Sequence, residues 1–150
     1  MNRLPGNTLG AQLRHFKRER VQALPTRIVQ ETVREFSDQL VRFWSPYGDP
    51  ALWKSPPPAD YKPGNFRSSW FFSVGRASAA KTDATDHDQA PWGIEGLGDV
   101  TAGLPLYLSN SADHAGALEA CHSSQAPTGI MVNSLEFEGI AYAVTRRLVG

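Results

Sequence analysis

The sequence predicts a single α+β domain, in which a small, mostly antiparallel sheet packs with a long N-terminal helix and a C-terminal helix. Two observations predict this class. Apolar residues recur at helical spacing near both ends of the chain, and two short segments between them alternate apolar with other residues, as strands do. The chain has 150 residues, a size at which one domain buries about 70% of its unfolded surface.

A basic amphipathic helix is predicted first, from Thr8 to Leu24, within an N-terminal helical extension, residues 1–24. Pro25 removes a backbone donor but is tolerated in the first turn of a helix, so we expect a second helix to begin there. An apolar stripe along this second helix supports it: Val29, Val33, Phe36, Leu40 and Phe43.

Residues 45–64 form a proline-rich insertion with six prolines and two glycines, a composition that excludes a helix or a central strand. A disordered linker is one interpretation. The aromatic side chains favour a loop that packs on its own domain or on a neighbour. We therefore expect Tyr47, Trp53 and Tyr61 to contact a neighbouring subunit, and deletion of residues 48–60 to leave a folded protein.

Alternating apolar residues predict a strand over 66–74 and a second over 104–109, with Pro105 at its start or at an edge. The intervening segment 76–99 is acidic and glycine-containing, and we expect a long exposed loop that forms part of a hairpin.

Three further elements are predicted toward the C-terminus. A short helix spans 111–120, with Ser111 or Asp113 as its cap. A strand follows over 128–132. The closing helix begins with the capping-box spacing of Asn133 and Glu136. Its apolar stripe and its basic last turn are Phe137, Ile140, Ala141, Val144 and Leu148, then Arg146 and Arg147.

Charge is balanced overall, with 15 basic and 15 acidic side chains, which argues against a dedicated nucleic-acid binder. The balance hides a gradient, because the first 42 residues are mainly basic and residues 76–100 mainly acidic. Arg14, Lys17, Arg18 and Arg20 could contact DNA phosphates, although a solvated face or a protein docking surface is favoured. The single cysteine and the lack of a signal peptide or a membrane span favour a protein made in the cytosol.

Few residues suggest chemistry. Cys121 beside His122 resembles a nucleophile and its base, but adjacent side chains rarely point at each other, so a structural cysteine is favoured. The donors of Asp83, Asp86, His87 and Asp88 lack the spacing of a calcium loop, so a solvated loop is favoured. Phosphate-loop and dinucleotide-binding motifs are also lacking. We therefore predict no catalytic residue, no cofactor and no metal.

More specific information lies in two stretches, Lys62-Pro-Gly-Asn-Phe-Arg-Ser-Ser-Trp70 and residues 106–131, which include LYLSN, then LE, then QAPTGIM. In this order they resemble the tail-completion, or neck, proteins of long-tailed bacteriophages. The chain departs from that pattern at His114, where the family commonly has tyrosine, at Ala120-Cys121, and in its longer insertion. Seven motif residues are expected to have structural roles: Arg67, Trp70, Asn110, Glu119, Gln125, Pro127 and Gly129. Pro127 and Gly129 would position the entry to a strand.

The resemblance implies a structural virion protein, assembled in the host cytoplasm, that forms a ring at the head-tail junction. The ring is expected to be a homo-oligomer, most often a hexamer, that joins connector or adaptor proteins to tail terminator or tail tube proteins. Arg14, Lys17 and Arg18 would face a partner. A small DNA-binding or regulatory module that uses the basic first helix is the alternative, and a hydrolase built on Cys121 is a third.

A ring at this position must pass DNA without binding it specifically, because several phosphate contacts would slow passage. The acidic loop is the natural lining of such a channel. We expect five carboxylates to face the lumen or its rim: Asp83, Asp86, Asp88, Glu95 and Asp99. The alternative is an acidic outer surface whose only role is solubility.

Overall fold

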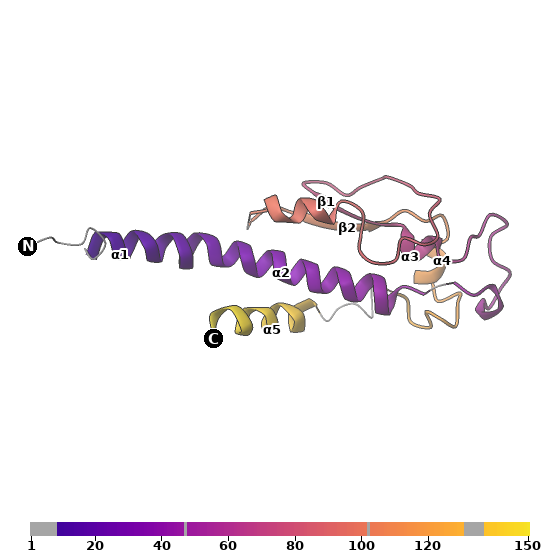
Figure 1. The fold of residues 1–150 in the computed structure, drawn as a ribbon. Coiled ribbons are helices and arrows are strands. Elements are labelled where there is room, and N and C mark those ends of the chain that lie inside the picture. The colour runs from indigo at the N-terminus through magenta and orange to yellow at the C-terminus, as the bar shows by residue number, and fades with distance from the viewer. Residues whose placement is uncertain (1–8, 47, 102, 131–136) are drawn as a thin grey trace, which may run out of the picture.

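A computed structural model describes residues 9–46, 48–101, 103–130 and 137–150. Its dominant element is a helical rod that runs from Leu9 to Trp44, a length of about 50 Å (Figure 1). The rod has four consecutive parts: α1 (Leu9–Phe16), the π-helical η1 (Lys17–Ala23), α2 (Leu24–Gln39) and the π-helical η2 (Leu40–Trp44).

The two helices predicted at the N-terminus are one continuous rod. Pro25 does lie in the first turn of α2, as predicted, but the residue before this helix, Ala23, keeps helical angles of φ −79° and ψ −40°. A proline ring collides with the carbonyl four residues earlier in a regular α-helix. The residue four before Pro25 is Val21, which lies in η1, and the wider i→i+5 winding there gives the ring room, so the rod continues instead of breaking.

The sheet has two antiparallel strands, β1 (Trp70–Val74) and β2 (Leu106–Asn110), in a register that pairs Trp70 with Asn110 and Val74 with Leu106. This confirms the predicted hairpin. The first strand begins later than predicted because Gly64, at φ +84°, starts a turn of helix, α3 (Asn65–Ser68), in which Phe66 is buried. The second begins immediately after Pro105, which has no N–H for the ladder.

The acidic segment 76–99 is not wholly exposed, which corrects the prediction. Its second half contains a 3₁₀-helix, η4 (Ile94–Asp99), and both Pro91 and Leu97 are fully buried. Trp92 pairs with β1 through its backbone, since its N–H donates to Trp70 O at 2.9 Å and its carbonyl accepts from Phe72 N at 2.8 Å. Backbone pairing at this edge of β1 holds the segment on the sheet.

At the C-terminal end, α4 (Ala115–Glu119) is shorter than predicted. Its N-cap is His114, with no side-chain capping bond, so neither Ser111 nor Asp113 is the cap. Residues 128–130 form no strand, and the rest of that predicted strand, with the predicted capping box of Asn133 and Glu136, lies outside the described residues.

The closing helix is confirmed as α5 (Phe137–Val149), which buries Ile140 and Val144. It packs against α2, and Arg147 Nη1 in its last turn pairs with Glu35 Oε1 at 2.7 Å.

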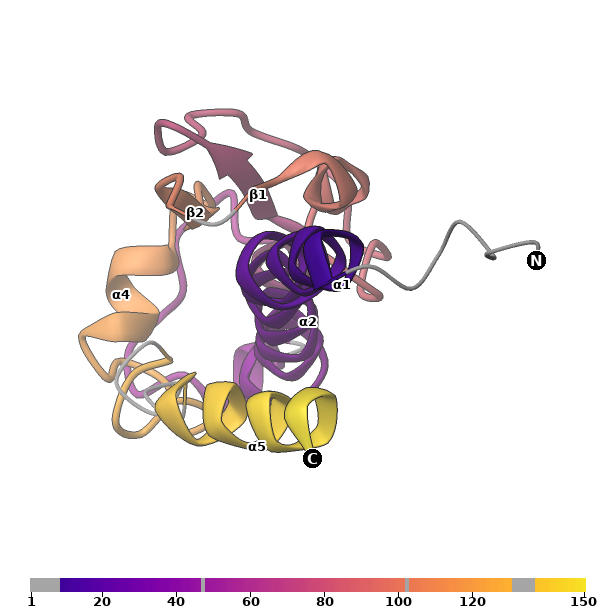
Figure 2. The same cartoon turned by 90° about the vertical axis from the view of Figure 1, so that its left-hand side faces the viewer.

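The core has two clusters, and the rod contributes to both. Leu40 and Val41 pack with residues of α3, β1, α4 and the segment after α4, whereas Val33 packs with Phe72, Leu97 and Val100. The sheet and α5 lie on different sides of α2 (Figure 2). No helix in the described part of the chain is long and apolar enough to cross a membrane.

Candidate assembly surfaces

The first surface is the overhanging helix, residues 9–23, which comprises α1 and η1. It extends beyond the sheet and α5 (Figure 1), and neither part has a buried residue. Four large apolar side chains on it are exposed, from Leu9 at 70% to Val21 at 57%, with Leu13 and Phe16 between them. Full burial of such a side chain contributes about 1.5–3 kcal/mol, so this stripe is a costly surface to leave in water.

Basic side chains share this helix. Arg14, Lys17, Arg18 and Arg20 are all exposed, and Arg18 Nε pairs with the neighbouring Glu19 at 3.2 Å. The structure thus places the predicted docking residues Arg14, Lys17 and Arg18 on an uncovered apolar helix. Their contact with a partner stays a prediction.

The second surface is an apolar groove of about 440 Å³ between α2, the sheet and α5. Its walls are almost entirely aliphatic and aromatic, and Leu104, at the lead-in to β2, is 48% exposed. Four elements far apart in sequence supply the lining, which is Ile28, Val29, Thr32, Val33, Phe36, Phe72, Leu104, Leu106, Tyr107, Leu108 and Ala141.

The proline-rich insertion packs on its own domain. The Trp53 and Tyr61 rings are half-buried and lie 5.1 Å apart, and Tyr61 lies 4.9 Å from the ring of buried His114. The hydroxyl of Tyr61 donates to the carbonyl of Gly48. The loop therefore packs on its own domain, which is one of the two arrangements expected from the sequence. Contact of Trp53 and Tyr61 with a neighbouring subunit stays a prediction, while Tyr47 lies outside the described residues.

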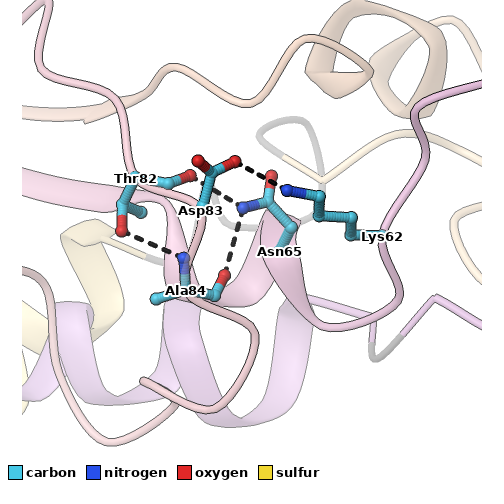
Figure 3. Close-up of polar contacts among 5 residues, drawn as sticks. All are labelled: Lys62, Asn65, Thr82, Asp83 and Ala84. Atoms are coloured by element: carbon cyan, nitrogen blue, oxygen red, sulfur yellow. Dashed lines mark hydrogen bonds and ion pairs between the residues drawn. The ribbon is translucent and has the colours of Figure 1, made fainter.

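A polar pocket of about 400 Å³ lies where the acidic loop meets the start of α3. Figure 3 shows the polar contacts between these two segments. Lys62 Nζ pairs with Asp83 Oδ1 at 2.8 Å, a hydrogen bond that raises the pKa of Lys62 and lowers that of Asp83. Asn65 Nδ2 donates to the carbonyls of Thr82 at 2.9 Å and Ala84 at 3.1 Å. These contacts fasten the loop to α3.

A second ion pair in the same pocket joins Lys81 to Asp113, where a hydrogen bond again raises the lysine pKa and lowers the aspartate pKa. Sequence reasoning missed this pocket, since its paired groups lie on separate segments and show no local pattern. Each lysine in the pocket is already paired with a carboxylate. We therefore interpret these contacts as ones that hold neighbouring segments of the fold together.

The five carboxylates predicted to line a channel do not share one segment of the fold. Asp83 is held by Lys62, and Asp86 and Asp88 follow it in the loop. The other two, Glu95 and Asp99, are exposed on η4, which packs against α2 and β1. Their orientation toward a lumen stays a prediction.

Motif residues from the resemblance make contacts inside the fold. Asn110 Nδ2 donates to Phe66 O at 2.8 Å, which joins the end of β2 to α3. Gln125 Oε1 accepts from Asp49 N at 3.0 Å, so this side chain satisfies an exposed backbone donor. Arg67 and Trp70 donate hydrogen bonds to the end of the rod, at Arg42 and Ser45.

The turn after α4 holds three further motif residues. Glu119 Oε1 accepts from Ile130 N at 3.1 Å, and Gly129 has a positive φ of +82°, which a glycine adopts without strain. Pro127 bridges to Gly129, but no strand follows among residues 128–130, so the expected strand entry is a closed turn instead.

Cys121 lies in the same turn at φ +63°, and its Sγ donates to the carbonyl of Glu119 at 3.7 Å. Across the described ranges, no three His, Cys, Asp or Glu side chains are placed to hold a metal ion. Comparison with known proteins gives no match to a family model, to a curated protein or to a solved structure.

Proposed function

We propose that this chain is a structural virion protein that forms a ring at the head-tail junction of a long-tailed bacteriophage. It joins the connector to the tail and leaves a channel for DNA. The kind of assembly comes from the resemblance of residues 62–70 and 106–131 to neck proteins. The observation that supports assembly is the exposure of four large apolar side chains on the overhanging helix.

A ring requires heterologous contacts, in which one patch of each copy meets a different patch of the next. The overhanging helix and the groove are two such unlike patches on one chain. We propose a hexamer located in the virion, with connector or adaptor proteins on one side and tail terminator or tail tube proteins on the other. In this role the chain needs no catalytic residue and no cofactor.

The experiment is to produce phage particles without this protein. Filled heads and finished tails that fail to join, and that join again when the purified wild-type protein is added, support the proposal. The same heads and tails mixed without added protein are the control. Normal virions made without the protein overturn the proposal.

A small DNA-binding or regulatory module is the second candidate, and one observation favours it: all four basic side chains of the overhanging helix are exposed. Phosphate contacts make duplex affinity fall steeply with salt. Steep salt dependence that is lost in the Arg14→Gln, Lys17→Gln, Arg18→Gln triple variant would favour this module over the neck protein.

A further inference from the structure

We infer that the overhanging helix of one copy seats in the apolar groove of a second copy of this chain. The inference rests on the ring proposed above and names the two surfaces through which the ring closes. Three observations support it. The apolar side chains form a stripe on one face of the helix, this helix cannot reach the groove of its own chain, and charged side chains lie near both surfaces.

Helical winding keeps the stripe on one face. Leu9, Leu13 and Phe16 follow the i, i+4, i+7 spacing of one side of an α-helix. Val21 comes five residues after Phe16, which would turn it away in regular α-winding. It lies in η1, however, where the i→i+5 bonding brings residues five apart close to the same face. The result is a continuous apolar edge about 20 Å long.

The groove fits an apolar helix but not its own. Its α2 wall consists of Ile28, Val29, Thr32, Val33 and Phe36, and the overhanging helix runs straight into α2 without a break. A helix that continues the wall of a groove does not fold back into it. The contact between stripe and groove is therefore possible only between two copies.

Charge favours the same pairing. The stripe is flanked by Arg14, Lys17, Arg18 and Arg20. Around the groove, η4 packs on lining residues such as Phe72 and presents exposed Glu95 and Asp99, and exposed Glu138 precedes lining residue Ala141 by one turn of α5. Two basic side chains on α2 are also exposed next to lining residues: Arg27 beside Ile28, and Arg34 beside Val33, where Arg34 Nη1 pairs with Glu31 Oε1 at 3.7 Å. A basic helix that enters the groove beside Glu95, Asp99 and Glu138 combines apolar burial with attraction to these carboxylates.

The test compares the purified full-length protein with two single variants by sedimentation velocity. Phe16→Glu places a charge on the stripe, and Leu104→Glu places one at the exposed edge of the groove. Each is expected to weaken self-association by roughly 100-fold, because a carboxylate would have to enter an apolar contact. Gln22→Glu adds the same charge to an exposed position of the same helix and is expected to leave self-association unchanged.

Mixing the two variants makes the test specific. Phe16→Glu keeps an intact groove and Leu104→Glu an intact helix, so an equal mixture is expected to form dimers and nothing larger. A wild-type protein that is monomeric overturns the inference. Self-association that survives Leu104→Glu but not Phe16→Glu also overturns it, and indicates pairing of one overhanging helix with another. Failure of the proposed function is distinguishable, since normal virions without the protein would overturn that function while leaving the measured contact intact.

Discussion

The guanidinium of Arg67 donates from Nε to the carbonyl oxygen of Ser45 at 3.0 Å, and so ties α3 to the residue that follows the long rod. Its Nη2 also donates to Arg42 O at 2.7 Å. The last carbonyls of a helix have no partner within the helix, and here a buried side chain 25 residues further along supplies one. The Ser45 hydroxyl donates to Leu40 O and accepts from Trp70 Nε1, both at 2.8 Å.

Arg67→Lys is expected to destabilise the fold by about 2–3 kcal/mol, because the single ammonium cannot replace the forked donors and leaves a buried carbonyl unsatisfied. Urea unfolding followed by tryptophan fluorescence measures the change. Arg76→Lys, at an exposed position, is the control and is expected to have no effect. A loss below about 0.5 kcal/mol for Arg67→Lys would show that these bonds contribute little.

Trp53→Ala is expected to cost about 2–3 kcal/mol, less than for a fully buried tryptophan, because the half-buried ring packs against the first core cluster. Deletion of residues 48–60 is now expected to destabilise the domain, which reverses the expectation from sequence. Thermal unfolding measures both changes. Leu52→Ala, at a neighbouring residue that is 42% exposed, is the control. An unchanged melting temperature in Trp53→Ala would restore the interpretation that this ring serves an interface.

Sequence periodicity predicted those elements whose pattern is local. The stripe that includes Val33 and Leu40 indicated α2, and Ile140 with Val144 indicated α5, because each helix buries one face. Alternation failed at Phe66, which is buried in a helical turn after Gly64 instead of in a strand. A buried aromatic residue fits either structure, so the pattern alone could not distinguish them.

Only one of the two candidate surfaces could be predicted from the sequence, and that one only in part. The basic and apolar residues of the overhanging helix were visible, but their lack of cover depends on where α5 and the sheet end along the rod. The groove could not be predicted at all, because it forms only when Val29, Phe72, Leu104 and Ala141 meet from different elements. Likewise, the burial of Trp53 depends on a bridge to Ser123, 70 positions later in the chain.

Gly129→Ala is expected to destabilise the protein by about 1–3 kcal/mol. Its φ of +82° disfavours a side chain, and the added Cβ would lie 2.9 Å from Glu119 Oε2 and 3.2 Å from Glu119 O. Gly139→Ala is a matched control in α5, where a Cβ meets nothing within 4 Å, and is expected to stabilise by about 0.5–1 kcal/mol. Chemical denaturation of both variants checks the contrast, and equal effects would contradict it.

Acid sensitivity is expected from His114, which is 5% exposed and surrounded by the rings of Trp53, Tyr61 and Phe66. Desolvation by burial lowers its pKa, against smaller opposing effects of Asp113 and Asp60. In the unfolded chain the histidine has a pKa of about 6.5. The folded protein therefore keeps this imidazole neutral at pH values where the unfolded chain already binds a proton. Stability from this group is complete above that pH and is lost as the pH falls toward the lowered folded pKa.

The measurement is the free energy of unfolding between about pH 8 and 5, where one proton changes it by at most about 1.4 kcal/mol per pH unit. His114→Phe keeps a ring in the cluster but cannot titrate, so its stability is expected to vary less over this range. His122→Phe, at an exposed position, is the control and is expected to keep the wild-type slope. The ion pair of Asp113 with Lys81 does not interfere, because it lowers the aspartate pKa and so moves that titration to more acidic pH. Parallel profiles for wild type and His114→Phe would assign the acid sensitivity to another group.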